Sequence, residues 1–127
     1  MKLRIHGNSI RLRLTRSEVT EFQIAGRVGS KLEFASDEEF TYSLVSDADA
    51  NEVSANMADG IEIRVPAAIA EHWTSTEDVG IGGEMSVGND RNLKVLVEKD
   101  FTCLVPRSGD EDVDTFPHPK AASASND

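Results

Sequence analysis

The sequence predicts an α+β fold in which one motif, a strand followed by a helix and three more strands, occurs twice. Two stretches carry this prediction, because 10–22 and 61–73 each alternate apolar and polar residues over five positions and then change to helical spacing. Short connections do not allow parallel crossovers, so we expect a mostly antiparallel sheet. The sheet would be curled or closed into a barrel, with the two helices on one face. We expect this duplicated domain to span residues 1–105.

The first copy follows an alternating segment at 2–6 and a turn at 7–9. Thr15 with Glu18 three residues later is the pattern of a capping box, and Gly26 suits a left-handed helix end, so we expect a helix over 16–25. Alternating apolar residues predict the three following strands, at about 28–35, 40–46 and 52–57.

The second copy begins after Asp59-Gly60, a sequence typical of a tight hairpin turn. Pro66 is accepted in the first turn of a helix, which we expect to end near 74–76. Trp73 aligns with Phe22 in the first copy, and we therefore interpret both as core residues. The remaining predicted strands lie at 79–87, 92–98 and 101–105.

The charge is uneven and acidic overall. The 127 residues carry a formal net charge of −10, which argues against general binding to nucleic acid or to an anionic membrane. Residues 1–31, however, hold seven basic and two acidic side chains. This basic segment either pairs with acidic strands of the same chain or faces an anionic ligand.

The composition predicts the cellular location of the protein and the character of its C-terminal segment. The single cysteine, Cys103, cannot form an internal disulfide, which fits a reducing compartment, and its apolar neighbours predict a buried side chain. We find neither a membrane-spanning apolar run nor a signal peptide, so we expect a cytoplasmic protein. Residues 106–127 are acidic and rich in Ala and Ser, which predicts a largely disordered tail. Phe116 either anchors this tail or is solvated with it.

Alternation places charged side chains on the sheet face opposite the helices, which is either open to water or lines a lumen. Guanidinium and ammonium groups that converge there would bind phosphate oxygens. The anion-binding candidates are Arg4, Arg11, Arg13, Arg64 and Lys94. The weaker candidates for metal ligands are Glu33, Glu62, Glu84 and Glu98.

Two resemblances follow from these segments. Parts of the chain resemble a small family of uncharacterised bacterial proteins, on Met1-Lys2-Leu3-Arg4-Ile5, Asn8-Ser9-Ile10-Arg11-Leu12-Arg13-Leu14-Thr15, Val97-Glu98-Lys99-Asp100-Phe101 and Asp114-Thr115-Phe116-Pro117. The duplicated motif is similar to the triphosphate tunnel (CYTH-like) fold, which implies an eight-stranded barrel that binds polyphosphate and divalent metal in its lumen. That family's Glu-x-Glu-x-Lys motif is replaced here by Lys2-Leu3-Arg4-Ile5-His6, so its catalysis does not carry over.

We found no phosphate-binding loop, zinc-ligand spacing or nucleophile elbow, and no candidate catalytic residue. The leading hypothesis is therefore a non-catalytic binding or accessory domain that needs no cofactor. The alternative is an anion- or polyphosphate-binding tunnel protein, acting with Mg²⁺ as a phosphohydrolase. Besides a small anionic ligand, a protein partner or a homodimer is compatible with an unpaired edge strand.

Overall fold

The computed structural model describes residues 1–57, 60–101 and 116. The first half contains β1 (Lys2–Ile5), β2 (Ser9–Leu14), α1 (Arg16–Ala25), β3 (Arg27–Ala35) and β4 (Glu38–Asp47). The second half contains β5 (Ser54–Met57), β6 (Gly60–Pro66), α2 (Ala67–Ser75), β7 (Gly80–Gly88) and β8 (Arg91–Lys99). The predicted strand at 101–105 lies outside the described residues apart from Phe101, and so does Cys103.

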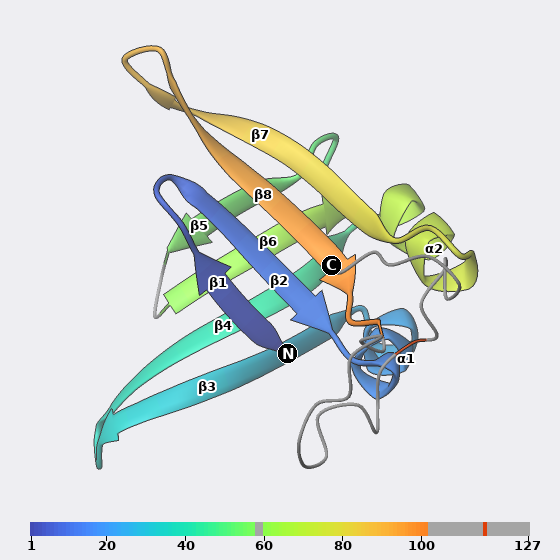
Figure 1. The fold of residues 1–127 in the computed structure, drawn as a ribbon, viewed down its shortest axis with the longest axis horizontal. Coiled ribbons are helices and arrows are strands. Elements are labelled where there is room, and N and C mark those ends of the chain that lie inside the picture. Colours follow the sequence, from blue (N-terminus) through green and yellow to red (C-terminus); the bar gives the residue numbers. More distant parts are fainter. Residues whose placement is uncertain (58–59, 102–115, 117–127) are drawn as a thin grey trace.

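The strands form two four-stranded sheets (Figure 1). Sheet A has the order β1-β2-β8-β7, and sheet B has the order β3-β4-β6-β5. Four antiparallel hairpin pairings are joined by two parallel ones, β2 with β8 and β4 with β6. The mostly antiparallel pairing is thus confirmed. The strands β2 and β8 are distant in the sequence, and β4 and β6 are separated by residues 48–59, which include β5, so neither parallel pair needs a short crossover.

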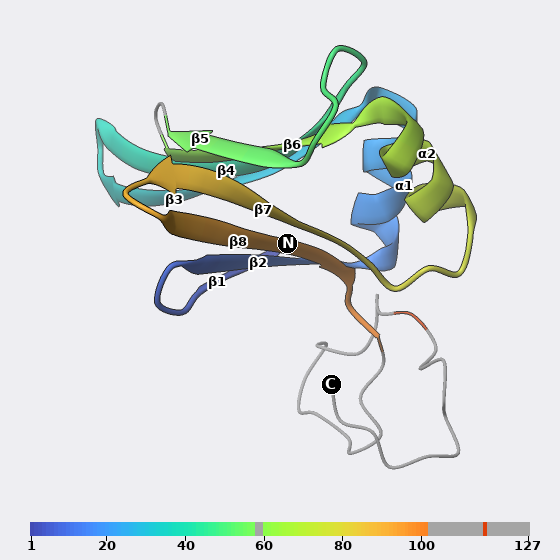
Figure 2. The ribbon, with the colours of Figure 1, turned by 90° about the horizontal axis from the view of Figure 1, so that it is seen from above.

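The two sheets face each other, and the helices lie together at one end of the layered pair (Figure 2). The expected barrel is therefore wrong, because the described strands make two separate sheets. The helices also do not cover one face of a single sheet, since α1 and α2 both contact β4, while α1 contacts β2 and α2 contacts β7. They close one end of the space between the sheets.

The two sheets correspond strand by strand. Each sheet consists of two antiparallel hairpins that lie side by side. The inner strand of one hairpin pairs in parallel with the inner strand of the other. This matches β1 with β5, β2 with β6, β3 with β7 and β4 with β8. Each half then reads hairpin, helix, hairpin, so β1 has a counterpart and is not an extra strand. An evolutionary duplication stays a prediction.

Local sequence signals set the ends of the first helix. The Thr15 side chain accepts a hydrogen bond from the backbone of Glu18, whose carboxylate accepts one from the Thr15 backbone at 2.9 Å. This is the predicted capping box, which satisfies donors that a helix start leaves free. Gly26 ends α1 with φ of 73°, a left-handed conformation that costs glycine little.

One hydrophobic core lies where the helices meet both sheets. The rings of Phe22 and Trp73 meet edge to face with centroids 6.3 Å apart, and both are almost fully buried. The Trp73 indole N–H donates to the carbonyl of Val79 at 3.1 Å. Both residues are therefore core residues, as predicted. The most deeply buried aliphatic side chains come from both sheets: Leu12, Leu14, Leu44, Ile63, Val65 and Val97.

Candidate functional site

The inner faces of the sheets become exposed toward the ends of the hairpins. On sheet A, Leu12 is fully buried, whereas Ile5 on the adjacent strand is 59% exposed. On sheet B, Val28 is 3% exposed and Phe34, on the same strand, is 69% exposed. The core therefore fills the helix end of the molecule and leaves the opposite end open.

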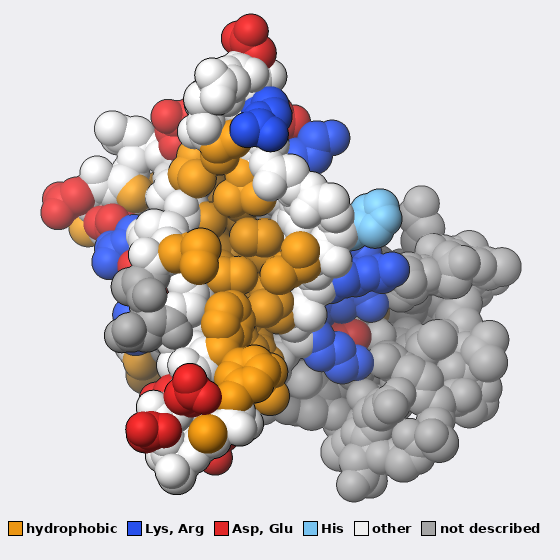
Figure 3. Space-filling model, turned by 90° about the vertical axis from the view of Figure 1, so that its left-hand side faces the viewer, with side chains coloured by type: hydrophobic (Ala, Val, Ile, Leu, Met, Phe, Trp, Pro, Cys, Tyr) orange, Lys and Arg blue, Asp and Glu red, His pale blue; other side chains and the backbone are white. Residues whose placement is uncertain are grey.

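We call this open end the apolar mouth and define it by Ile5, Leu32, Phe34, Met57, Met85 and Val87. Five of the six are exposed, and Met85 is half-buried. Figure 3 looks onto this end and shows hydrophobic side chains in a continuous band, with acidic groups at its lower end and basic groups along one flank. A hollow of about 360 Å³ opens in it, lined by Ile5, Ile10, Ala55, Met57, Ile61, Met85 and Leu93 beside the polar turn at 7–9.

The mouth exists because both helices lie at one end of the layered pair, where they fill the space between the sheets, and the hairpins extend beyond them (Figure 2). A nine-residue strand spans about 30 Å, so its far end lies well away from the helices. The apolar alternation of β3 and β7 continues past the part that the helices cover. Leu32, Phe34 and Met57 fall within the alternating segments that predict strands at 28–35 and 52–57, but alternation does not show how far the helices cover those strands.

The outer face of sheet A carries the basic residues of the first strands. Lys2 lies opposite Arg13 and Arg4 lies opposite Arg11 in the register of β1 with β2, and these residues border a hollow of about 310 Å³. Like charges directly opposite on neighbouring strands repel. Glu98 compensates in part, with its carboxylate 3.5 Å from Nε of both Arg11 and Arg13.

Further charges complete this face. Lys2 Nζ lies 3.5 Å from the Asp100 carboxylate. Lys94 borders a neighbouring hollow of about 530 Å³, together with Arg11 and Glu84. Four of the five anion-binding candidates thus share the outer face of sheet A: Arg4, Arg11, Arg13 and Lys94.

The fifth candidate, Arg64, lies on sheet B and is held by two acids. Its guanidinium is 3.0 Å from the Asp47 carboxylate and 2.9 Å from that of Glu62. The backbone N–H of Asp49 and then Arg64 hold the pKa of Asp47 below its usual value. Desolvation raises the pKa of Glu62, but the charge and hydrogen bond of Arg64, with hydrogen bonds from Asn56 and Arg27, outweigh it and the net shift is downward. Arg64 is therefore engaged by acidic residues of its own sheet.

The four glutamates suggested as metal ligands are divided between the sheets. Glu33 and Glu62 belong to sheet B, and Glu84 and Glu98 belong to sheet A. Across residues 1–57, 60–101 and 116, no three His, Cys, Asp or Glu side chains gather closely enough to hold a metal ion. The polar faces are the outer faces of the two sheets, so the described strands form no polar lumen.

A buried lysine holds Phe116 on the body of the protein. Lys99 is 5% exposed, and its Nζ donates to the carbonyl of Thr76 at 2.7 Å. The same ammonium lies 5.5 Å from the Trp73 ring centroid and 5.6 Å from that of Phe116. Phe116 N–H donates to the Asp100 carbonyl at 2.8 Å. Phe116 itself therefore contacts the body of the protein, as the anchor hypothesis expects. The rest of the predicted tail, residues 106–115 and 117–127, lies outside the described residues.

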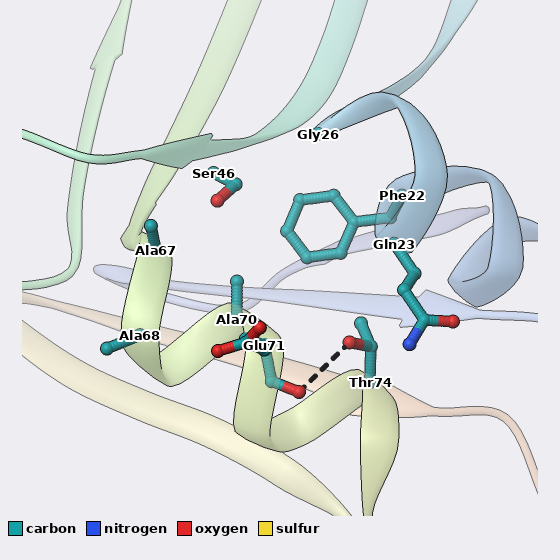
Figure 4. A pocket seen from close by; sticks show the side chains of 9 residues that line it. All are labelled: Phe22, Gln23, Gly26, Ser46, Ala67, Ala68, Ala70, Glu71 and Thr74. Atoms are coloured by element: carbon teal, nitrogen blue, oxygen red, sulfur yellow. Dashed lines mark hydrogen bonds between the residues drawn. The ribbon is translucent and has the colours of Figure 1, made fainter.

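Another hollow, of about 520 Å³, lies between the two helices. Its lining comes from α1, α2 and β4 and is made largely of small side chains, with Phe22 at its base (Figure 4). The Thr74 hydroxyl there donates to the Glu71 carbonyl at 3.2 Å, inside its own helix. No basic side chain lines it, and its polar groups come from Gln23, Ser46, Glu71 and Thr74. Unlike the mouth, this hollow has no large exposed apolar side chain among the described residues that line it, because Phe22 is only 2% exposed and its other apolar lining is alanine.

No helix in the described part of the chain is long and apolar enough to cross a bilayer. Comparison with curated proteins and with solved structures finds no match. The triphosphate tunnel architecture therefore gains no support from a solved relative. One family model matches residues 1–120, and its description is a family of unknown function, DUF7009. The chain belongs to this family of unknown function.

Proposed function

We propose that this protein is a non-catalytic binding protein and that a partner docks on the apolar mouth. The observation that carries the proposal is the exposure of five large apolar side chains at one end of the sheets: Ile5, Leu32, Phe34, Met57 and Val87. A contiguous apolar surface of this kind, rimmed by charges, is typical of an interaction site. The described residues also supply no cluster suited to metal chemistry.

Covering the mouth would provide a useful binding energy. Burying a fully exposed Phe or Met side chain gains roughly 1.5–3 kcal/mol, so each of these half- to four-fifths-exposed side chains would gain about 1–2 kcal/mol. Five of them give about 5–10 kcal/mol, which is similar to the cost of association, about 4–15 kcal/mol. Apolar burial alone thus supports weak binding, and charges at the rim would have to supply the rest.

The fluorescence of 8-anilinonaphthalene-1-sulfonate tests this surface on dilute protein. The dye should bind the native chain, and the double variant Phe34→Ser with Met57→Ser should bind much less. Ile24→Ser is the matched control, since Ile24 is 80% exposed but lies on α1, away from the mouth. Equal loss in the control and in the mouth variant would reject the proposal.

Anion binding on the outer face of sheet A is a second candidate, favoured by one observation. Four basic side chains, Lys2, Arg4, Arg11 and Arg13, face each other in two like-charged pairs, and among the described residues their ion pairs are with Glu98 and Asp100. A phosphate group would relieve that repulsion and accept guanidinium hydrogen bonds. Without grouped metal ligands among the described residues, the proposal covers binding and not hydrolysis.

Thermal shift with tripolyphosphate, nucleotides and Mg²⁺ tests this second candidate, because a ligand of the native state raises its stability. Arg4→Gln with Arg11→Gln should abolish the shift. Arg27→Gln, on sheet B, is the control and should keep it. An unchanged melting temperature of the native protein at saturating tripolyphosphate would exclude this candidate.

A further inference from the structure

We propose that the apolar mouth binds the mouth of a second copy of this chain, giving a dimer with two-fold symmetry. This inference rests on the proposed function and names its partner. A two-fold interface uses the same patch on both copies, so the patch must be complementary to itself. The mouth meets this condition because its two sides differ in charge.

Sheet A forms a basic side and sheet B an acidic one. The strands of sheet A carry seven basic and two acidic side chains, and one of the basic ones, Lys99, is buried at the helix end; those of sheet B carry three basic and five acidic ones. Two hairpins carry this difference beside the mouth. The β1–β2 hairpin carries Arg4 and Arg11 near Ile5, and the β3–β4 hairpin carries Glu33, Glu38 and Glu39 near Phe34, with Lys31 3.5 Å from Glu39.

A two-fold axis that runs between the two sheets would place sheet A of one copy against sheet B of the other. The apolar side chains would then be buried in the centre, and opposite charges would meet at the rim. Such an arrangement is typical of protein interfaces, which have an apolar core and a polar rim. Complementary charges also fix the relative orientation of the partners.

The same charges argue against an arrangement in which equivalent sheets of the two copies face each other. Sheet A against sheet A would oppose the four basic residues of β1 and β2 to their own copies. Each pair of like charges costs free energy when it is drawn together. Ile24 and Ile69 are also exposed, but they lie on α1 and α2, at the opposite end of the molecule from the mouth (Figure 2).

Sedimentation equilibrium of the full chain over a concentration series is the direct test. The native protein should approach the mass of two chains on concentration and of one on dilution. Phe34→Ser with Met57→Ser should weaken association about tenfold or more, while Ile24→Ser should match the native protein. Because both mouth side chains are largely exposed, the variants should keep the native far-ultraviolet circular dichroism.

Charge reversal tests the orientation of the two copies. Arg4→Glu should weaken association, and adding Glu38→Lys in the same chain should restore part of it. An Arg4→Glu effect that Glu38→Lys does not reduce would reject the antiparallel arrangement of the sheets. Reversal is preferable to a salt series, because salt also screens the repulsion between two chains of net charge −10.

The failure of this inference is distinguishable from failure of the proposed function. A native protein with the mass of one chain at every concentration would overturn the dimer. If the mouth variant still lost dye fluorescence, the mouth would bind a different molecule and the proposed function would stand. If neither mass nor dye responded to the mouth variant, both would fall.

Discussion

Replacing Phe22 and Trp73 tests whether the two halves of the chain share one core. Phe22 lies on α1 and Trp73 on α2, and their rings meet at a centroid distance of 6.3 Å. Both side chains are 2% exposed or less, so shortening either one leaves a cavity in the core. We therefore expect each substitution to destabilise the protein, and we expect the effects of the two on the free energy of unfolding to be non-additive.

The magnitudes follow from burial and contact. Phe22→Leu should lower the free energy of unfolding by about 1–2 kcal/mol, and Trp73→Leu by about 2–4 kcal/mol, which includes the lost hydrogen bond to Val79. An edge-to-face aromatic pair contributes about 0.5–1.5 kcal/mol beyond area burial. The double variant should therefore be less destabilised than the sum of the singles by this amount.

Urea denaturation followed by circular dichroism measures these values, since Trp73 is the single tryptophan and cannot report on its own removal. Ile24→Ala on the exposed side of α1 is the control and should change stability by less than about 0.5 kcal/mol. It should add independently to Trp73→Leu. Strict additivity of Phe22→Leu with Trp73→Leu, or two separate unfolding transitions, would refute the shared core.

Three further predictions concern single positions. Gly60→Ala should lower the free energy of unfolding by more than about 2 kcal/mol, because a Cβ there would lie 1.8 Å from the Thr41 carbonyl oxygen. Gly82→Ala is the control and should be tolerated, because the closest contact of its new Cβ would be at 3.8 Å. Thermal unfolding of the two variants compares them. Burial lowers the pKa of Lys99, so the unfolded chain holds this proton to a higher pH than the native protein does. The free energy of unfolding should therefore rise with pH between the lowered pKa and the ordinary value of 10.5. Lys99→Met should remove this rise, and an alkaline stability profile that the substitution leaves unchanged would contradict the prediction. Arg64→Gln should return the lowered pKa values of its two acidic neighbours toward normal in a carboxyl NMR titration, and should remove the part of the stability that is present above their ordinary pKa and lost as pH falls through the lowered values.

Local signals in the sequence predicted the elements well. Thr15, Glu18 and Gly26 fixed the limits of α1 because capping depends on neighbours in the chain. The alternating strands were placed correctly for the same reason, as was the burial of Phe22 and Trp73. The turn at 59–60 cannot be compared in full, because residues 58 and 59 lie outside the described part.

The pairing of distant strands could not be predicted in this way. The parallel contact of β2 with β8 depends on residues more than 80 positions apart, such as Ile10 with Val95, and periodicity carries no information on it. Without that pairing, two sheets looked like one barrel, and the polar faces looked like a lumen wall. Arg64 was therefore grouped with Arg11 although they lie on different sheets.

The mouth was missed because an alternating strand shows which side chains share a face, and not whether anything covers that face. Leu32 and Phe34 look the same in the sequence as Val28, which is buried. The position of the helices at one end of the sheets decides which of them the core reaches (Figure 2). This position is not known without the arrangement of the elements in space.

Methyl NMR of the three methionines tests most directly whether the mouth is the binding surface. Met57 and Met85 line the mouth, and Met1 packs on the core instead. With ¹³C-methyl-labelled protein, rising chain concentration should shift or broaden the Met57 and Met85 signals and leave Met1 unchanged. The account would be contradicted if the mass increased with concentration while only the Met1 methyl signal changed, or while none of the three methionine signals changed.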